Sequence, residues 1–247
     1  MSVASVKSVD KFVSGEEGSG RRPAQTEVGN MTETPNRLER RKARTRGALI
    51  AAAQGFIARG ELNAPIAEIT QAADVGMGSF YNHFVSREQL FQAAVDGALE
   101  LLGTYLDSLT DSSADPAEAF TRSFRIAGRL FRLQPELSRV LIHSGPELIT
   151  SQHGLGPRAA RDIEAGVVAG YFQVPDIQLA LALVAGALLG MGQLLLEQPE
   201  RSDVESVDRM AYGVLLALGV SDTDAQDLCA RSLPPMSDVP SVDGDSD

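Results

Sequence analysis

Apolar residues recur at intervals of three and four along most of the chain, and no segment alternates between apolar and polar residues. The first spacing is typical of amphipathic helices and the second of strands. Proline, glycine and capping residues divide the pattern into separate segments. We therefore predict an all-α fold. The predicted helices cover residues 37–59, 66–73, 77–83, 87–109, 115–133, 135–143, 157–173, 177–197, 203–218 and 223–233.

The 247 residues fall into four parts, within the length expected for one or two folded domains. Residues 1–36 are rich in Ser, Gly, Glu and Val with little periodicity, so we predict a disordered N-terminal arm. Residues 37–85 carry three predicted helices and form a first domain. Residues 86–233 form a second helical domain, and residues 234–247 are a flexible acidic tail.

The two short predicted helices at 66–73 and 77–83 have the spacing of a helix-turn-helix unit. Ile66, Ile69 and Ala73 share one helical face. We expect Gly76 to supply the positive φ that a sharp turn demands. Phe80 then anchors the second helix, so that its hydroxyl and amide side chains can contact phosphates and bases. The pattern predicts a DNA-reading domain.

The charge is distributed unevenly. Residues 37–95 hold eight Lys or Arg against five Asp or Glu, whereas residues 96–247 hold ten against twenty-three, and the whole chain has a net charge of −11. Basic residues crowd the start of the first predicted helix, where they oppose the helix dipole. A nearby polyanion explains this placement, and a solvated charged face is the alternative. DNA contact should therefore be confined to the N-terminal domain.

The run VGMGSFYNHFVSREQLF at residues 75–91, with the basic helix before it, resembles the N-terminal domain of the TetR (tetracycline-repressor) family. The detailed match covers residues 38–99. Ser86 and Gln89 form a capping box for the next helix. One departure is that Ala64 and Pro65 stand where the family usually has a hydroxyl residue, so we expect Asn63 to act as the cap. The predicted DNA-contacting residues are Arg44, Thr45, Gly76, Met77, Gly78, Ser79, Tyr81, Asn82, His83 and Arg87.

The resemblance implies that the C-terminal domain encloses a cavity for a small-molecule effector. Because Trp is absent and aromatic residues are few, we expect an aliphatic or mixed lining. Each candidate could instead be plain core, and His143 could be an ordinary core or surface histidine. The arginines on the helix at 115–133 are expected to form a solvated face. The candidate pocket residues are Tyr105, Phe120, Phe124, Phe131, Leu141, His143, Val167, Phe172, Met191 and Leu194.

Two late helices carry more apolar surface than one chain needs, which predicts a homodimer. Glycines on a helix surface permit close crossing of a second helix, and two such helices from each subunit would form a four-helix interface. The alternative is that the glycines ease packing within one chain. A dimer would place two reading helices on a near-palindromic site. The predicted interface residues are Leu179, Leu183, Gly186, Gly190, Ala211, Val214, Leu215 and Leu218.

The sequence thus predicts a TetR-like homodimeric repressor, released from double-stranded operator DNA by a small hydrophobic or amphipathic ligand. The alternative is a helical small-molecule-binding protein without operator binding. We expect no enzymatic activity, cofactor or metal, because the three histidines and Cys229 lack the spacing of a metal site and no nucleophile motif occurs. One cysteine suits a cytoplasmic protein. The apolar stretch at 177–196 is interpreted as an interface helix and not as a membrane span.

Overall fold

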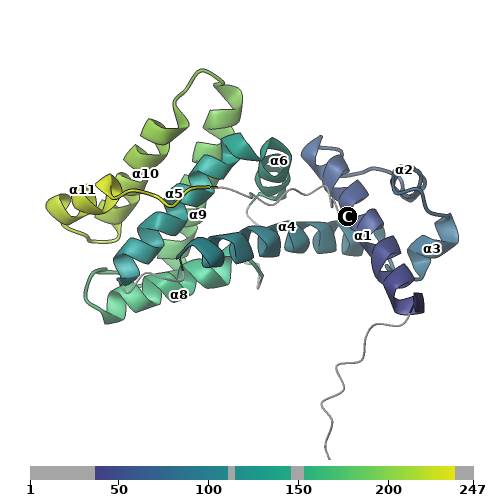
Figure 1. Cartoon of the computed structure of the whole chain (residues 1–247), viewed down its shortest axis with the longest axis horizontal. Coiled ribbons are helices and arrows are strands. Elements are labelled where there is room, and N and C mark those ends of the chain that lie inside the picture. Colours follow the sequence, from purple (N-terminus) through teal and green to yellow (C-terminus); the bar gives the residue numbers. More distant parts are fainter. Residues whose placement is uncertain (1–36, 111–114, 146–152, 237–247) are drawn as a thin grey trace, which may run out of the picture. The chain divides into compact units, whose positions relative to one another are not determined.

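The computed structural model describes residues 37–110, 115–145 and 153–236, and all regular structure in these ranges is helical (Figure 1). This confirms the predicted all-α class. The predicted N-terminal arm and most of the predicted acidic tail lie outside the described residues. The helices are α1 (Arg37–Ala58), α2 (Ile66–Ala72), α3 (Met77–Tyr81), α4 (Arg87–Thr110), α5 (Pro116–Leu133), α6 (Pro135–Ser144), α8 (Leu155–Val168), α9 (Ile177–Glu197), α10 (Asp203–Ala217) and α11 (Asp222–Ala230).

The turn between α2 and α3 differs from the prediction. Asp74, and not Gly76, takes the positive φ, at 51°. Short polar side chains tolerate this left-handed conformation. Gly76 has a φ of −72° and is the N-cap of α3. The predicted cap at Asn63 is also wrong, because Pro65 is the N-cap of α2 and no side chain caps that helix.

Helix α8 ends five residues before the predicted limit. Gly170 takes a φ of +81°, and the N–H groups of Tyr171 and Phe172 both donate to the carbonyl of Gly166. A Cβ atom at Gly166 would lie 2.3 Å from the ring of Phe172. The chain therefore turns back because Gly166 leaves room for this ring. The apolar period had suggested that Phe172 continued the helix.

One hydrophobic cluster runs through the first four helices. Leu49 and Ile57 of α1, Ile69 of α2, Phe80 of α3 and Leu90 of α4 are all almost completely buried. The same cluster continues into side chains of α5 and α6. Helix α4 packs on α1 and also on α5, α6 and α8 (Figure 1). It therefore connects the helix-turn-helix region to the helices that follow.

A second cluster joins α5, α8, α9, α10 and α11. Asp176 caps α9 as its sequence suggests, accepting hydrogen bonds from the N–H groups of Gln178 and Leu179 at 2.9 and 3.2 Å. By length and composition α9 could cross a membrane, although in this structure it packs on α5, α6, α8 and α10. Only a third of its apolar window is buried within the chain.

The arginines of α5 do not form a solvated face, which corrects that expectation. Arg125 is buried and donates to both carboxylate oxygens of Asp208 at 2.8 and 3.1 Å. Arg129 donates to the same carboxylate. Arg132 donates to three carbonyls between α9 and α10, including that of Gln198 at 2.6 Å. These ion pairs and hydrogen bonds fasten α10 and its preceding loop to α5.

We predict that Asp208→Asn lowers the free energy of unfolding by roughly 2 kcal/mol. The loss is smaller than for a fully enclosed pair because Asp208 keeps some access to water. It arises because two neighbouring guanidinium groups lose their shared counter-charge. Urea unfolding measures it. Asp227→Asn, which removes the same charge from an exposed position on α11, is the control, and equal stability of the two variants would contradict the role of Asp208.

Candidate DNA-reading and ligand-binding sites

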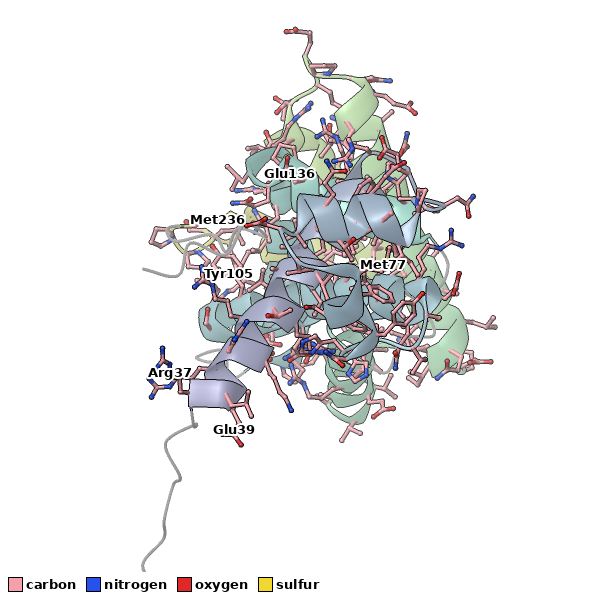
Figure 2. All side chains as sticks on the ribbon, turned by 90° about the vertical axis from the view of Figure 1, so that its right-hand side faces the viewer. Arg37, Glu39, Met77, Tyr105, Glu136 and Met236 are labelled. Carbon is pink, nitrogen blue, oxygen red and sulfur yellow. The ribbon has the colours of Figure 1, made fainter. Side chains whose placement is uncertain are left out.

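The surface around α3 presents most of the predicted DNA-contacting residues. Figure 2 looks toward this part of the chain, with Met77 at the start of α3 and Arg37 at the start of α1. Gly76, Met77, Gly78, Tyr81 and Asn82 are exposed, whereas Ser79, His83 and Arg87 are half-buried.

Two phenylalanines hold α3 in place. Phe80 is fully buried and meets the ring of Tyr81 edge-on at 5.2 Å. Phe84 is buried beneath the guanidinium of Arg46, which lies 5.2 Å from its ring centre. Added Cβ atoms at Gly76 and Gly78 would meet nothing within 4 Å. The backbone at these two positions is therefore open to close approach by a phosphate.

The start of α4 has the Ser86 half of the predicted capping box, whereas the side chain of Gln89 bonds one residue before the cap. The N–H of Gln89 donates to the hydroxyl of Ser86 at 3.2 Å, and the side-chain carbonyl of Gln89 accepts from the N–H of Val85 at 2.7 Å. Arg87 lies in the first turn and pairs with Glu88 at 2.9 Å. These hydrogen bonds fix the first turn of α4, which carries Arg87.

Helix α1 adds an exposed basic surface. Thr45 is half-buried on this helix, and the side chains around it are positively charged. The exposed basic residues are Arg37, Arg40, Arg41, Lys42, Arg44 and Arg46.

A cavity of about 60 Å³ lies between α4, α5, α8 and α9, and we call it the charged cavity. Its apolar wall includes Phe120 and Phe124, which were predicted as pocket residues. Its polar side chains are Asp107 of α4, Ser123 of α5 and Arg158, Arg161 and Asp162 of α8. A hydroxyl-bearing ring could pack on the phenylalanines and donate to the carboxylates.

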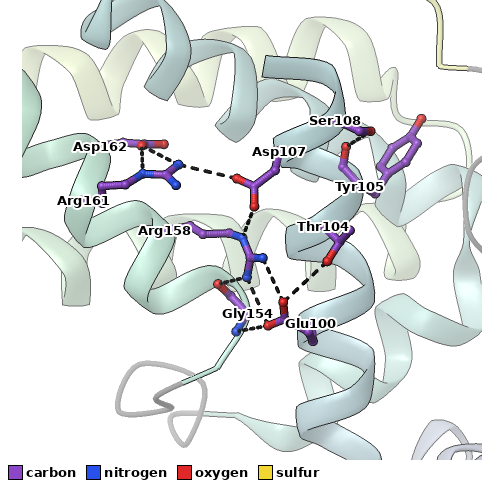
Figure 3. A network of polar contacts seen from close by, with 9 residues as sticks. All are labelled: Glu100, Thr104, Tyr105, Asp107, Ser108, Gly154, Arg158, Arg161 and Asp162. Carbon is purple, nitrogen blue, oxygen red and sulfur yellow. Dashed lines mark hydrogen bonds and ion pairs between the residues drawn. The ribbon is translucent and has the colours of Figure 1, made fainter. Parts of the chain in front are cut away.

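The charged residues of this cavity form one network (Figure 3). The Nε–H of Arg158 donates to Asp107 at 2.6 Å, and its Nη2–H donates to Glu100 at 2.9 Å. The N–H of Gly154 also donates to Glu100, at 3.2 Å. Because Glu100 and Asp107 are seven residues apart on α4, Arg158 spans two turns of that helix. The start of α8 is thereby fastened to α4.

Arg161 extends the network to Asp162. It donates to Asp162 at 2.9 Å and lies 3.5 Å from Asp107. Hydrogen bonding to Arg158 lowers the pKa of Glu100, whereas burial raises the pKa of Asp162 despite its pairing with Arg161. Three carboxylates share two guanidiniums, so the network retains capacity to accept hydrogen bonds from a ligand.

A second cavity of about 70 Å³, which we call the apolar cavity, adjoins the first. Phe131 and Leu141, both predicted pocket residues, line it. No charged side chain contributes to its wall. Leu155, Ala159, Val184 and Leu188 line both cavities.

The other six predicted pocket residues lie elsewhere. Phe172 is in a layer behind the charged cavity, edge-on to Phe120 at 5.4 Å. His143 is exposed and lies beside Gly60 at the end of α1. The remaining four residues line neither cavity, because they pack in hydrophobic clusters or lie at the partly buried surface: Tyr105, Val167, Met191 and Leu194.

The sequence prediction missed the charged half of the site. Arg158, Arg161 and Asp162 follow Leu155 at helical spacing, so charged groups occupy a partly apolar helical face. Asp107 likewise interrupts an apolar face of α4. Charged residues on an otherwise apolar helical face could have identified these positions from the sequence. Which of them form ion pairs is seen only in the structure.

The predicted dimer surface divides into two groups. Leu179, Leu183, Gly186 and Gly190 of α9 are exposed, and added Cβ atoms at the two glycines would meet nothing within 4 Å. The four residues predicted on α10 are buried in this chain's own core, where they cannot reach a second subunit: Ala211, Val214, Leu215 and Leu218.

The exposed residues of α10 are not the ones that were predicted to lie at the dimer interface. Val204, Gly213 and Leu216 are exposed there, and a Cβ atom at Gly213 would also meet open space. Periodicity identified α10 as having an apolar stripe, but that stripe covers α5 and α11.

The described residues contain no group of three or more His, Cys, Asp or Glu side chains placed to hold a metal ion. Cys229 is partly buried, and burial raises the pKa of its thiol.

Two family models and a solved structure match this chain. Residues 48–94 match the bacterial regulatory proteins of the tetR family, and residues 115–231 match the tetracyclin repressor-like C-terminal domain. The crystal structure of RolR in complex with resorcinol is 33% identical, with a TM-score of 0.58, and the match covers 80% of this chain and 99% of that chain. The chain belongs to the TetR family. It is a TetR-family transcription regulator, as its sequence predicted.

Other TetR-family structures agree with this assignment. RolR without ligand is 35% identical with a TM-score of 0.64, and the match covers 77% of this chain and 98% of that chain. A TetR-family regulator from Shewanella sp. PV-4 is 20% identical with a TM-score of 0.62, covering 71% of this chain and 97% of that chain, and it shows the shared fold. No curated protein matches the sequence.

We predict that Asp162→Asn changes the stability of this TetR-family protein in a pH-dependent way. Burial raises the pKa of Asp162, so the folded state favours the neutral carboxyl. Its stabilising contribution is present below the ordinary aspartate pKa of about 3.9 and is lost as the pH rises through the raised value. The stability of the variant relative to wild type should therefore increase between pH 4 and pH 7.

Thermal unfolding at several pH values measures this difference. Asp227→Asn, which removes a carboxylate from an exposed position of α11, is the control for the loss of one negative charge. A difference for Asp162→Asn that is constant, or that decreases with pH, would contradict the role of burial.

Proposed function

We propose that this regulator is a homodimeric repressor that leaves a near-palindromic operator when a small phenol enters the charged cavity. One observation carries the proposal. Helix α4 begins at Arg87, soon after α3 ends at Tyr81, and reaches Asp107 in the wall of the charged cavity. Arg87 and Asp107 are separated by about 30 Å of continuous helix at 1.5 Å per residue.

The α3 surface and the basic start of α1 support DNA contact. Open backbone at Gly76 and Gly78 admits phosphate, and the hydroxyl and amide of Tyr81 and Asn82 are exposed. Arg44 and its basic neighbours add the positive charge that attracts the DNA backbone. We therefore propose that α3 enters the major groove while α1 contacts phosphates.

The chemistry of the charged cavity and the likeness to RolR support a phenolic ligand. RolR is crystallised with resorcinol, a ring with two hydroxyl groups. In this chain Phe120 and Phe124 offer an apolar face for such a ring, and Asp107 and Asp162 offer hydrogen-bond acceptors. Phenolic hydroxyls that donate to Asp107 would compete with Arg158 for that carboxylate.

Ligand binding can act on DNA through α4. Arg158 and Gly154 fasten α8 to Glu100, so a shift of α8 around the ligand displaces α4 as well. In a dimer this movement changes the distance between the two reading helices. A few kcal/mol of preference for the displaced state suffices to release most of the operator.

The exposed face of α9 supports the dimer. Leu179 and Leu183 are 69% and 43% exposed. Gly186 and Gly190 have no side chain and open space beside them, so the helix surface is shallow at these two positions. Gly213 and Leu216 of α10 are exposed as well. We propose that a second copy covers both helices. A reducing cytoplasm, where DNA is accessible, is the proposed location.

Sequence selection from random duplex DNA by the purified full-length protein tests this function, together with its mass in solution. We expect a dimer that enriches a near-palindrome at moderate salt and releases it when resorcinol is added. A monomer, or a dimer that enriches no sequence, would contradict the proposal of a repressor. Enrichment without release by resorcinol would contradict the phenolic ligand and leave DNA recognition intact.

We predict that Tyr81→Ala weakens binding to the selected operator by about tenfold. The change removes an exposed ring and hydroxyl from α3, and one good contact contributes about 1–3 kcal/mol. Fluorescence anisotropy with labelled operator measures the affinity. Tyr171→Ala removes another exposed tyrosine, after α8, and is the control. Equal affinities of the two variants would remove Tyr81 from the DNA contacts, provided that both have wild-type thermal stability.

A further inference from the structure

The apolar cavity has no part in binding the phenol ring proposed above. Its wall includes Phe131, Leu141, Leu181 and Ala185, and no polar side chain lines it. Unfilled space of this kind costs stability, because the surrounding atoms lose packing contacts. It excludes a hydrogen-bonded water and favours an apolar group. The cavity is therefore suited to a hydrocarbon substituent.

The two cavities meet at a shared wall. Leu155 and Ala159 of α8 and Val184 and Leu188 of α9 line both of them. The side chains at this junction are all aliphatic, and Ala159 is small. A ligand that reaches from one cavity to the other thus meets no polar group that it would have to desolvate.

The polar side chains of the site all belong to the wall of the charged cavity. They are Asp107 of α4, Ser123 of α5 and Arg158, Arg161 and Asp162 of α8. The polarity of the site therefore falls from the charged cavity, across the shared aliphatic wall, to the apolar cavity. A ligand with one hydroxyl-bearing end and one alkyl end matches this order.

We propose that the effector is an alkyl-substituted phenol, with its hydroxylated ring in the charged cavity and its alkyl group in the apolar cavity. This inference rests on the proposed phenol-responsive function and adds the class of ligand. Each methylene buried in the apolar cavity should increase affinity about fourfold, until the space is filled. Resorcinol itself occupies only the charged cavity and leaves this gain unused.

Calorimetric titration of the full-length protein with resorcinol and its 5-methyl, 5-propyl and 5-pentyl derivatives tests the proposal. We expect affinity to rise from resorcinol to the propyl derivative by at least tenfold. Equal affinities for all four compounds would overturn the inference and leave the phenol-responsive function standing. Absence of binding by every compound would contradict both.

Ala185→Leu provides the matched variant, because Ala185 lines the apolar cavity alone. The added carbons should fill that cavity, so resorcinol affinity stays within about twofold of wild type while the gain from the alkyl group is lost. Ala230→Leu, at an exposed position of α11, is the control and should keep the gain. A gain that persists in Ala185→Leu would place the alkyl group elsewhere and overturn the proposal.

Leu189→Phe is a second filling variant from the same wall, for use if Ala185→Leu does not fold. In this variant too, the affinity for resorcinol should stay near that of wild type while the gain from the alkyl group is lost. Thermal unfolding of each variant, without ligand, establishes that it is folded before the titrations are compared.

Discussion

The hydrogen-bonded ion pairs of Arg158 join α8 to α4, and the proposed communication between the ligand and DNA sites depends on this connection. The guanidinium lies between Glu100 and Asp107, two carboxylates on α4 that are seven residues apart. Charge-assisted hydrogen bonds of this kind have a defined geometry, unlike the apolar contacts elsewhere between these helices. Gly154 adds a backbone contact to Glu100, and its Cα approaches the backbone of Leu99 so closely that a side chain would not fit. The start of α8 is therefore held directly against the middle of α4.

The packing of α4 and α5 extends this connection toward the candidate DNA-reading region and the charged cavity. Helix α4 shares its first turns with the core of the DNA-reading region, where Leu90 packs with Phe80 of α3. Farther along, Asp107 contributes to the charged cavity. On the opposite side of the helical bundle, Arg125 and Asp208 fix α10 to α5, so that α5 offers a stable surface against which α8 can shift. In the proposed mechanism, a ligand between α5 and α8 would therefore act on a continuous helix and not on a flexible linker.

Sequence periodicity predicted nearly every helix, because burial of one apolar face dominates helix formation in a protein of this size. Periodicity failed where a turn conformation, a close contact or the choice of packing partner decides the structure. Asp74 takes the left-handed turn conformation in place of Gly76, and room at Gly166 ends α8 early. Periodicity also cannot say which partner covers an apolar face: Leu215 of α10 packs within its own chain, whereas Leu183 of α9 remains exposed. Phe120 and Phe124 of the charged cavity were among the predicted pocket residues, but its charged side depends on contacts such as that between Asp107 and Arg158, which are more than fifty residues apart in the sequence.

The most direct measurement is the effect of resorcinol on operator affinity in Glu100→Gln, beside its effect in wild type and in Glu164→Gln. Glu100 lies outside the wall of the charged cavity, and Glu164 is an exposed carboxylate of α8. We expect wild type and Glu164→Gln to lose operator affinity by about 5- to 150-fold when resorcinol binds. Glu100→Gln should bind resorcinol with nearly wild-type affinity and lose most of this response. A full response in Glu100→Gln would show that the Arg158 connection does not carry the signal from the cavity to DNA.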